Sequence, residues 1–321
     1  MRLNVSRYIG LISIAVLASS HTQAQQFPSQ DIHFITAYQP GSSSDAIVRF
    51  IAEKMRPLAG VTIIVENKPG ANGNIATEYS ARAKPDGYIV YIHAGSSLAA
   101  NMHLYKKPPV DVSKAIQMVG TINRQAFMLA VDAKSPYSNV ADLTAAMRRK
   151  GSRGSYATYA ATATIMGELY KRAAGLDTVE VPYKIGADTL NDLRSGALDY
   201  GMYDPVFAMA QRRNGNLRIL GIGVRERLQA APDLSTMKEQ DIDVDLPGWF
   251  AAMVPAGTPQ PVVTQLNKWL NQVVASEETK RFLNSFGSDP WSSTPSEAQA
   301  QLLRDIKDWG DYVRVAKIEP Q

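Results

Sequence analysis

Alternating strand-like and helix-like segments constrain the fold of this chain more than any other feature. Short apolar runs typical of buried strands occupy residues 31–38, 61–65 and 88–93. Between these runs, residues 43–58 and 75–83 carry apolar side chains at the spacing of one helical face. Because strands separated by helices usually pair in parallel, this order predicts an α/β fold with a mostly parallel sheet and helices on its faces.

Ligands of open parallel sheets bind beyond the carboxyl ends of the strands. Three segments directly follow the predicted strands and would form that edge, namely the loops 39–45, 68–74 and 94–97. The sequence therefore predicts that a binding site includes these three loops.

The same alternation then restarts and predicts a second unit of similar build. Its strands are expected at residues 126–131, 154–158, 178–181, 200–203 and 217–224. Its helices are expected at residues 140–150, 162–174, 187–195 and 206–213. After a loop-rich segment, the chain ends with a strand at 248–255 and helices at 259–275, 277–286 and 295–315.

The terminal helices carry no signature of the second unit, so we expect the chain to return to the first one. Crossovers are predicted near residues 123–127 and 247–249. Lobe 1 would then comprise residues 25–123 and 248–321, and lobe 2 residues 124–247. Two similar α/β lobes with two hinge crossovers are typical of a clamshell that closes around a ligand.

The first residues have the pattern of a cleaved export signal. Arg2 and Arg7 form a positive region, an apolar stretch follows at residues 8–18, and residues 22–24 (TQA) have small residues at both critical positions of a cleavage site. We expect residues 1–24 to be removed by cleavage after Ala24, and the alternative is an uncleaved anchor. No cysteine follows the apolar stretch, which excludes lipid attachment there.

The composition excludes several classes of function. Apolar residues make up 45% and charged residues 20% of the 321 positions, as in ordinary soluble globular proteins. The net charge of +4 falls by two with the signal peptide, and the basic run at residues 148–150 suits a helix end, so no nucleic-acid partner is expected. The chain contains no cysteine, and it therefore forms no disulfide and uses no thiolate.

Motifs for catalysis and cofactor binding are absent from the sequence. It contains no G-x-S-x-G, no G-x-x-x-x-G-K-[ST] and no G-x-G-x-x-G, so no cofactor is expected. His33, His93 and His103 lack the spacing of metal ligands. A serine of residues 42–44 with His93 is the one pair that resembles a nucleophile and a base. A periplasmic serine hydrolase therefore stays an alternative, but we expect no enzymatic activity.

The segment from Tyr38 to Asp45 (YQPGSSSD) is the most informative local motif. It lies between a strand and an amphipathic helix, where free backbone N–H groups and the helix dipole attract anions. The alternative is that Ser42 or Ser43 only caps the helix, with Asp45 in its first turn. Asp45 suits an anion site if its carboxylate accepts hydrogen bonds within the turn and does not meet the charge of the ligand.

Residues 40–45 (PGSSSD) resemble the PGGSSD loop of the Bug-type binding proteins of tripartite tricarboxylate transporters. Further segments are similar to motifs of this family and occur in the same order, namely VENKPGANG at 65–73, AKPDGY at 83–88, VPYK at 181–184, DLRSG at 192–196 and AGTP at 256–259. The matches extend from about residue 27 to the C-terminus. The resemblance implies a two-lobed type II periplasmic binding protein that captures a small carboxylate and delivers it to a membrane permease.

The resemblance also implies ligand-binding positions in both lobes of a monomeric protein. In lobe 1 these are Tyr38, Pro40, Gly41, Ser42, Ser43, Ser44, Asp45, Asn72, Gly73 and Ser96. In lobe 2 they are Thr158, Tyr159, Thr162, Thr164, Lys184, Gly186 and Asp204.

Departures from the family pattern bear on the ligand. Ser42 and Ile185 replace glycines, and the loop 156–164 lacks the glycines and the histidine of the family. Because the matched loops contain no evident arginine clamp, we expect recognition by backbone amides, hydroxyls and bridging water.

Tyrosines at three positions in or beside the matched loops bear on which carboxylate is bound. Tyr38, Tyr159 and Tyr203 make an aromatic dicarboxylate plausible, and an aliphatic dicarboxylate is the alternative. A sensory binding protein that signals carboxylate availability is an alternative that the sequence does not separate from transport. The effector lobe of a transcription regulator shares the architecture, but the export signal and the lack of a helix-turn-helix segment disfavour it.

Overall fold

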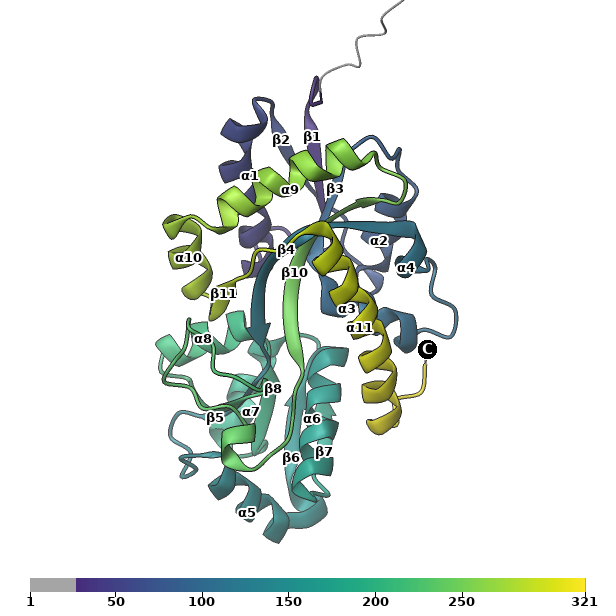
Figure 1. The fold of residues 1–321 in the computed structure, drawn as a ribbon. Helices are drawn as coiled ribbons and strands as arrows, with labels where there is room; N and C mark the ends of the chain where they lie inside the picture. The colour runs from purple at the N-terminus through teal and green to yellow at the C-terminus, as the bar shows by residue number, and fades with distance from the viewer. Residues whose placement is uncertain (1–26, 321) are drawn as a thin grey trace, which may run out of the picture.

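The computed structural model describes residues 27–320, and the expected signal peptide lies outside the described residues. Two separate sheets, each with its own helices, form two lobes that lie one above the other in Figure 1. The two-lobed α/β fold predicted from the sequence is therefore confirmed.

The sheet of lobe 1 has six strands in the order β11-β4-β10-β3-β1-β2. These strands are β1 (Ile32–Thr36), β2 (Ile63–Asn67), β3 (Ile89–Ala94), β4 (Ile116–Ala126), β10 (Pro247–Pro255) and β11 (Ser288–Pro290). β1 pairs in parallel with β2 and β3, as the sequence predicts. The pairs that involve β4, β10 and β11 are antiparallel, so the prediction of a mostly parallel sheet is wrong for that half.

The sheet of lobe 2 has five strands in the order β7-β6-β8-β5-β9. These strands are β5 (Met128–Asp132), β6 (Ser155–Thr158), β7 (Val179–Pro182), β8 (Tyr200–Tyr203) and β9 (Leu217–Ile222). β6 is parallel to β7 and β8, and β5 is antiparallel to β8 and β9. Both lobes thus combine a parallel group of strands with antiparallel strands that the β-α-β pattern does not predict.

Helices cover the faces of both sheets. Lobe 1 carries α1 (Ser43–Ala59), α2 (Asn74–Ala81), α3 (Gly95–Leu104), α4 (Val112–Ala115), α9 (Gln260–Val274), α10 (Glu277–Asn284) and α11 (Pro295–Val315). Lobe 2 carries α5 (Val140–Lys150), α6 (Ala161–Ala174), α7 (Thr189–Ser195) and α8 (Pro205–Arg213). Short 3-10 turns are η1 (Ala71–Gly73), η2 (Gly151–Arg153), η3 (Gly186–Asp188) and η4 (Lys238–Gln240). Within residues 27–320, no helix combines the length and the apolar character needed to cross a membrane.

The C-terminal helices return to lobe 1. α9 packs against α1 and β4, and α11 packs against α3 and β4 and also reaches α6. In Figure 1, α11 descends along one side of both lobes. Trp309 of α11 is almost fully buried, and Trp249 of β10 donates a hydrogen bond from Nε1 to Asp305 Oδ2 at 2.6 Å. These tryptophans hold the last helix against the first sheet.

The segment 94–97, expected as a loop, is the start of a helix. Ala94 has an extended backbone, and α3 begins immediately after it at Gly95. The residues of α3 are mostly small or apolar and are buried on nearly all sides. An amphipathic pattern is therefore missing, and the prediction of a loop is wrong at Gly95 to Ser97.

The two lobes are joined by very short or tightly held segments. A single residue, Phe127, separates β4 from β5. The Phe127 carbonyl accepts a hydrogen bond from Gly223 N at 2.9 Å, and the Gly223 carbonyl accepts one from Leu246 N at 2.7 Å. Phe127 of the outgoing chain and Leu246 of the returning chain are therefore both bonded to Gly223, which follows β9.

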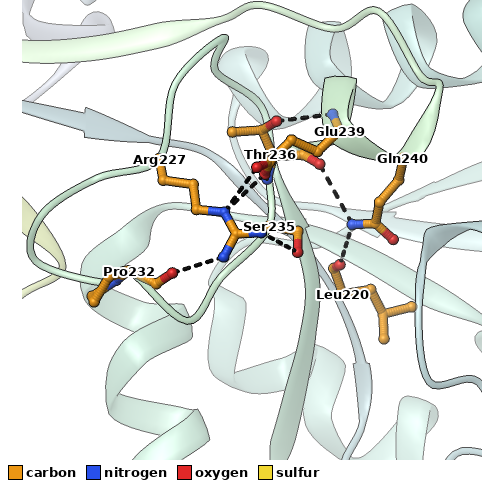
Figure 2. A network of polar contacts seen from close by, with 7 residues as sticks. All are labelled: Leu220, Arg227, Pro232, Ser235, Thr236, Glu239 and Gln240. Atoms are coloured by element: carbon orange, nitrogen blue, oxygen red, sulfur yellow. Dashed lines mark hydrogen bonds and ion pairs between the residues drawn. The ribbon is translucent and has the colours of Figure 1, made fainter.

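The loop-rich segment before β10 is held by side-chain contacts rather than by regular structure. Figure 2 shows Arg227, whose Nε donates to both carboxylate oxygens of Glu239 at 3.0 Å and whose Nη1 donates to Pro232 O at 2.9 Å. Gln240 Nε2 donates to Leu220 O of β9 at 2.9 Å. These contacts fix the segment to lobe 2 before the chain returns to lobe 1.

Candidate ligand-binding site

A cavity of about 260 Å³ lies between the two lobes, and we name it the cleft cavity. Most of its wall belongs to lobe 1, namely Ala37, Tyr38, Gln39, Pro69, Gly70, Asn72, Gly73, His93, Ser97, Ala100, Asn101 and Leu104. Lobe 2 contributes Ala160, Ala161 and Thr162. No Asp, Glu, Lys or Arg is among these residues.

A second cavity of about 340 Å³, the side cavity, adjoins the first. The two share Asn72, Leu104, Ala160 and Ala161. The remaining wall of the side cavity is Tyr105, Thr158, Tyr159, Thr164, Glu180, Pro182, Tyr183, Ile318 and Glu319. Two carboxylates, Glu180 and Glu319, distinguish it from the cleft cavity.

Three helices begin at the cleft cavity without a side-chain cap. α2 follows Gly73, α3 follows Ala94 and α6 follows Ala160, and none of these N-cap residues accepts a backbone hydrogen bond through a side chain. The first N–H groups of a helix have no partner inside the helix. Together with the helix dipoles, such N–H groups favour an anion. The three helix ends thus make the cleft cavity attractive to a carboxylate.

The start of α1 is different, because side chains of this segment accept hydrogen bonds from its backbone N–H groups. Ser42 Oγ accepts a hydrogen bond from Asp45 N at 3.2 Å and caps the helix. The buried Asp45 carboxylate accepts hydrogen bonds from Gly41 N, Arg49 Nε and Asn67 Nδ2. Burial alone would raise the pKa of Asp45, but these donors outweigh it and lower the pKa. Asp45 therefore organises the loop from within, as the capping alternative predicts.

The predicted ligand residues divide into two groups in the structure. Tyr38, Asn72, Gly73 and Thr162 line the cleft cavity, and Asn72, Thr158, Tyr159 and Thr164 line the side cavity. The others line neither cavity, namely Pro40, Gly41, Ser42, Ser43, Ser44, Asp45, Ser96, Lys184, Gly186 and Asp204. Of the loop 39–45, Gln39 alone reaches the wall of the cleft cavity.

Hydroxyl groups of lobe 2 are already hydrogen-bonded to carboxylates. Thr158 and Thr164 both donate to Glu180 Oε1, and Tyr159 donates to Asp204. Burial and the neighbouring Asp204 raise the pKa of Tyr159 well above its usual value, so its proton stays in place. A hydroxyl has a single proton, so in this arrangement these three groups can only accept hydrogen bonds from a ligand.

Ser97 and Asn101 of α3 also line the cleft cavity. Ser97 lies in the segment 94–97 that was expected at the binding edge, whereas no sequence pattern singled out Asn101. Asn101 Nδ2 donates to Asn72 O and to Asn74 Oδ1, both at 2.9 Å, and so holds the turn before α2. Because α3 lacked a recognisable helical pattern, nothing in the sequence placed Asn101 at the expected binding edge.

His93 lies in the wall of the cleft cavity but has no catalytic partner. Its side chain is buried, and neither ring nitrogen has a hydrogen-bond partner among the described residues. Burial lowers the pKa of His93 to about 4, which keeps the imidazole neutral at ordinary pH. No serine of residues 42–44 is bonded to it, and the described residues contain no group of three or more His, Asp or Glu side chains that could hold a metal.

Two α/β lobes with a cavity between them that suits a small anion define a solute-binding protein of the periplasmic type. A family model described as "Tripartite tricarboxylate transporter family receptor" matches residues 47–316. The chain therefore belongs to this family of receptors.

Individual proteins support this assignment over nearly the whole chain. A UPF0065 protein of Bordetella pertussis is 27% identical over 318 residues, which cover 98% of each chain. The solved structure of the periplasmic binding protein BugD is 26% identical, with a TM-score of 0.78 over 92% of this chain and 100% of BugD. The structure of R. palustris Rpa4515 with adipate is 26% identical, with a TM-score of 0.82 over the same shares of the two chains.

The family and these structures are those of periplasmic binding proteins, and they confirm the resemblance to Bug-type proteins. The protein is accordingly a binding protein and not an enzyme. The same relatives imply a periplasmic protein.

Proposed function

We propose that this protein captures a small carboxylate in the cleft between its lobes and delivers it to a tripartite tricarboxylate-type permease. The convergence of three uncapped helix ends on the cleft cavity carries this proposal. No charged side chain in the wall competes with these N–H groups for the anion. Backbone amides hold a carboxylate with charge-assisted hydrogen bonds.

A dicarboxylate is the ligand class that we favour. The related Rpa4515 was solved with adipate, an aliphatic dicarboxylate. Binding of an aromatic dicarboxylate would depend on the tyrosines near the cleft. Of these, Tyr38 lines the cleft cavity and Tyr159 lines the side cavity. Tyr203 is fully buried, and its hydroxyl bonds to Thr189, so it presents no free ring.

The proposal includes several steps outside the cavity itself. The chain is cleaved after Ala24 and works as a monomer in the periplasm. Closure of lobe 1 (residues 25–123 and 248–321) on lobe 2 (residues 124–247) occurs at the two crossovers. The boundary at residue 123 falls within β4, and that at residue 248 falls near the start of β10.

A thermal-shift screen of the mature protein from Gln25 tests the proposal. The panel contains adipate, malate, phthalate and benzoate, together with their amides as uncharged controls. A ligand that binds only the folded state raises the melting temperature by mass action. We expect a rise with at least one dicarboxylate and none with its amide. A rise with the amide alone, or no rise with any carboxylate, would refute carboxylate binding.

Transport and sensing are separated in cells. If the protein feeds a permease, deletion of its gene abolishes uptake of the radiolabelled ligand. Unchanged uptake, together with loss of a transcriptional response to the ligand, would favour the sensory alternative.

A further inference from the structure

Side-chain hydrogen bonds between the two lobes gather at one short segment of lobe 1. Asp289 of β11 accepts hydrogen bonds from Gln229 N at 3.0 Å and from Ala230 N at 2.7 Å, both in the loop after β9. Arg213 Nη1 of α8 donates to Ser285 O at 2.7 Å. In the part of the chain that the structure describes, and outside the connecting strands β4 and β10, every side-chain hydrogen bond between the lobes belongs to this group. We name the group the rear contact.

Helix α8 of lobe 2 packs closely against the same segment. Met209 and Arg213 lie four residues apart and therefore on one face of α8. Gly287 of lobe 1 has a φ of 68°, and a Cβ atom on it would lie 2.8 Å from Met209 Cγ. Glycine at this position thus suits both the backbone conformation and the close approach of α8.

The carboxylate at the centre of the rear contact is buried. Asp289 is 3% exposed, and Arg124 Nη2 lies 3.5 Å from its Oδ2. A buried carboxylate needs hydrogen-bond donors, because an unpaired charge away from water is costly. The two N–H groups of lobe 2 therefore stabilise Asp289 as long as the lobes keep this relative orientation.

The rear contact and the cleft cavity lie on opposite sides of the strands that connect the lobes. In the lobe 1 sheet, β4 and β10 separate β11 from β3 and β1, whose carboxyl ends lead into the cavity wall. In the lobe 2 sheet, β8 and β5 separate β9 from β6, which is followed by the start of α6 at the cavity. In Figure 1, β11 and α8 accordingly lie on one side of β4 and β10, and α3 and α6 lie on the other. A rotation about the connecting strands that narrows the cleft must therefore widen the rear contact.

We propose that the rear contact holds the lobes apart at the cleft and has to break when they close on a ligand, so that it lowers the affinity for that ligand. This inference rests on the proposed function, because the ligand is the carboxylate of the cleft cavity. When only the closed state binds well, the apparent affinity scales with the fraction of protein that is closed. The segment 285–289 thus tunes the affinity without touching the ligand.

The test compares Asp289→Ala and Arg213→Ala with the wild type. Asp289→Ala removes the acceptor of both lobe 2 N–H groups, and Arg213→Ala removes the bond to Ser285. The probe is the member of the panel of adipate, malate, phthalate and benzoate that raises the melting temperature of the wild type most. Calorimetry measures the affinities, and thermal unfolding of the ligand-free proteins is measured in parallel.

Two changes of opposite sign are expected for Asp289→Ala. The probe should bind about 5-fold more tightly, because the hydrogen bonds to this carboxylate no longer oppose closure. The ligand-free variant should melt at a lower temperature than the wild type, because it has lost the same bonds. Damage to the fold alone would lower both the melting temperature and the affinity.

Arg212→Ala is the matched control for Arg213→Ala. Both variants remove one positive charge from the end of α8, but Arg212 donates to Asp233 within lobe 2 and does not join the lobes. Arg213→Ala should bind the probe about 3-fold more tightly than Arg212→Ala, since it alone loses a bond between the lobes. If neither Arg213→Ala nor Asp289→Ala binds more tightly than Arg212→Ala, the proposal is overturned while carboxylate binding stands.

The remaining outcomes are also decisive. If no carboxylate raises the wild-type melting temperature, the proposed function fails, and small-angle X-ray scattering of the ligand-free proteins decides this inference. A smaller radius of gyration for Asp289→Ala than for the wild type supports the rear contact as a brake on closure, and an equal or larger one overturns it. If Asp289→Ala does not fold, the comparison of Arg213→Ala with Arg212→Ala decides, because both arginines lie at the surface end of α8.

Discussion

In lobe 1 some polar groups at the cleft cavity have no hydrogen-bond partner among the described residues, whereas in lobe 2 most hydroxyls of the cavity walls are bonded to carboxylates. The His93 ring nitrogens belong to the first kind. The helices α2 and α3 also start at the cavity without a side-chain cap, although Asn74 N of α2 donates to Ala71 O. Thr158 and Thr164, which share the Glu180 carboxylate, belong to the second. Lobe 1 therefore offers donors to an anion, while the side chains of lobe 2 mostly offer acceptors. The end of α6 is the exception in lobe 2.

This difference shows that two lobes of similar build offer different hydrogen-bonding groups to the ligand. An anion is expected to dock first on lobe 1, and α6 would complete its coordination when lobe 2 approaches. The acceptors of lobe 2 would then face whatever hydrogen-bond donors the ligand carries. Each prediction below changes one side of this comparison.

The largest effect is expected from Gly73→Ala in lobe 1. The new Cβ would collide with His93 Nε2 at 2.6 Å, and the backbone has a φ of 92°. Strain and overpacking together should lower the free energy of unfolding by about 3 kcal/mol and abolish carboxylate binding. Urea denaturation and calorimetry measure the two effects.

Gly196→Ala in lobe 2 is the control. Gly196 has a φ of 79°, and an added methyl group would have no other atom within 4 Å, so only the cost of the backbone conformation remains. That change should cost about 1 kcal/mol and leave binding intact. Equal losses for the two variants would show that the His93 contact is unimportant.

The pH dependence of stability should reveal the buried imidazole. His93 binds its proton in the folded state only near pH 4, whereas the unfolded chain binds it near 6.5. The folded state is therefore most favoured above pH 6.5 and loses up to about 3 kcal/mol as the pH falls from 6.5 toward 4. Urea denaturation at several pH values should show this loss as a difference between the free energies of unfolding of the wild type and His93→Phe.

Asp305 titrates in the same range with the opposite sign. Burial raises the pKa of Asp305 to about 6, so its contribution to stability improves as the pH falls below 6. Asp305 is present in both the wild type and His93→Phe. Its contribution therefore cancels when the free energies of unfolding of the two proteins are subtracted. Parallel curves for the wild type and His93→Phe would contradict a neutral buried His93.

Glu180→Gln should sharpen the comparison by removing a negative charge from the lobe 2 wall. A carboxylate ligand near the side cavity would be repelled less, and Thr158 and Thr164 could still bond to the amide oxygen. We expect roughly 3-fold tighter binding at low salt and a smaller gain at high salt. Calorimetry at two ionic strengths measures this difference.

Glu168→Gln is a suitable comparison for that variant. Glu168 bonds to Tyr156 and Lys171 and lines neither the cleft cavity nor the side cavity. It should leave the affinity unchanged. A weaker affinity for Glu180→Gln would indicate that the ligand presents a donor or a cation to Glu180.

The smallest effects are expected from Thr162→Ala and Ser43→Ala, which remove single hydroxyls. Thr162 lines the cleft cavity in the first turn of α6, and Ser43 is exposed at the start of α1. Thr162→Ala should weaken binding by about 1 kcal/mol, and Ser43→Ala should weaken it less. A larger effect at Ser43 would show that closure brings the loop 39–45 onto the ligand.

Local patterns were sufficient to predict most of the secondary structure. The helices at residues 140–150 and 295–315 and the strand at 200–203 match α5, α11 and β8 residue for residue. α3 was not predicted because it is buried on nearly all sides and so lacks an amphipathic pattern. β4 was not predicted because its polar residues interrupt the apolar pattern. The antiparallel half of the lobe 1 sheet depends on strands that return from distant parts of the chain.

The site was less predictable, because its chemistry depends on pairs distant in sequence. Thr158 and Thr164 were expected to donate to a ligand, but both donate hydrogen bonds to Glu180, which the pairing of β6 with β7 places beside Thr158. His93 was considered as a base because it ends a strand at the expected edge. Its lack of a hydrogen-bond partner among residues 27–320 results from the packing and has no signature in the sequence.

The join between β4 and β5 has a consequence for the cost of ligand capture. Only Phe127 lies between these strands, and hydrogen bonds through Gly223 tie it to the returning chain. Ordering a flexible connection costs about 1–2 kcal/mol of backbone entropy per residue. With almost no free residues to order, closure should lose little entropy at the crossovers. A larger share of the free energy of the ligand contacts then contributes to the binding affinity.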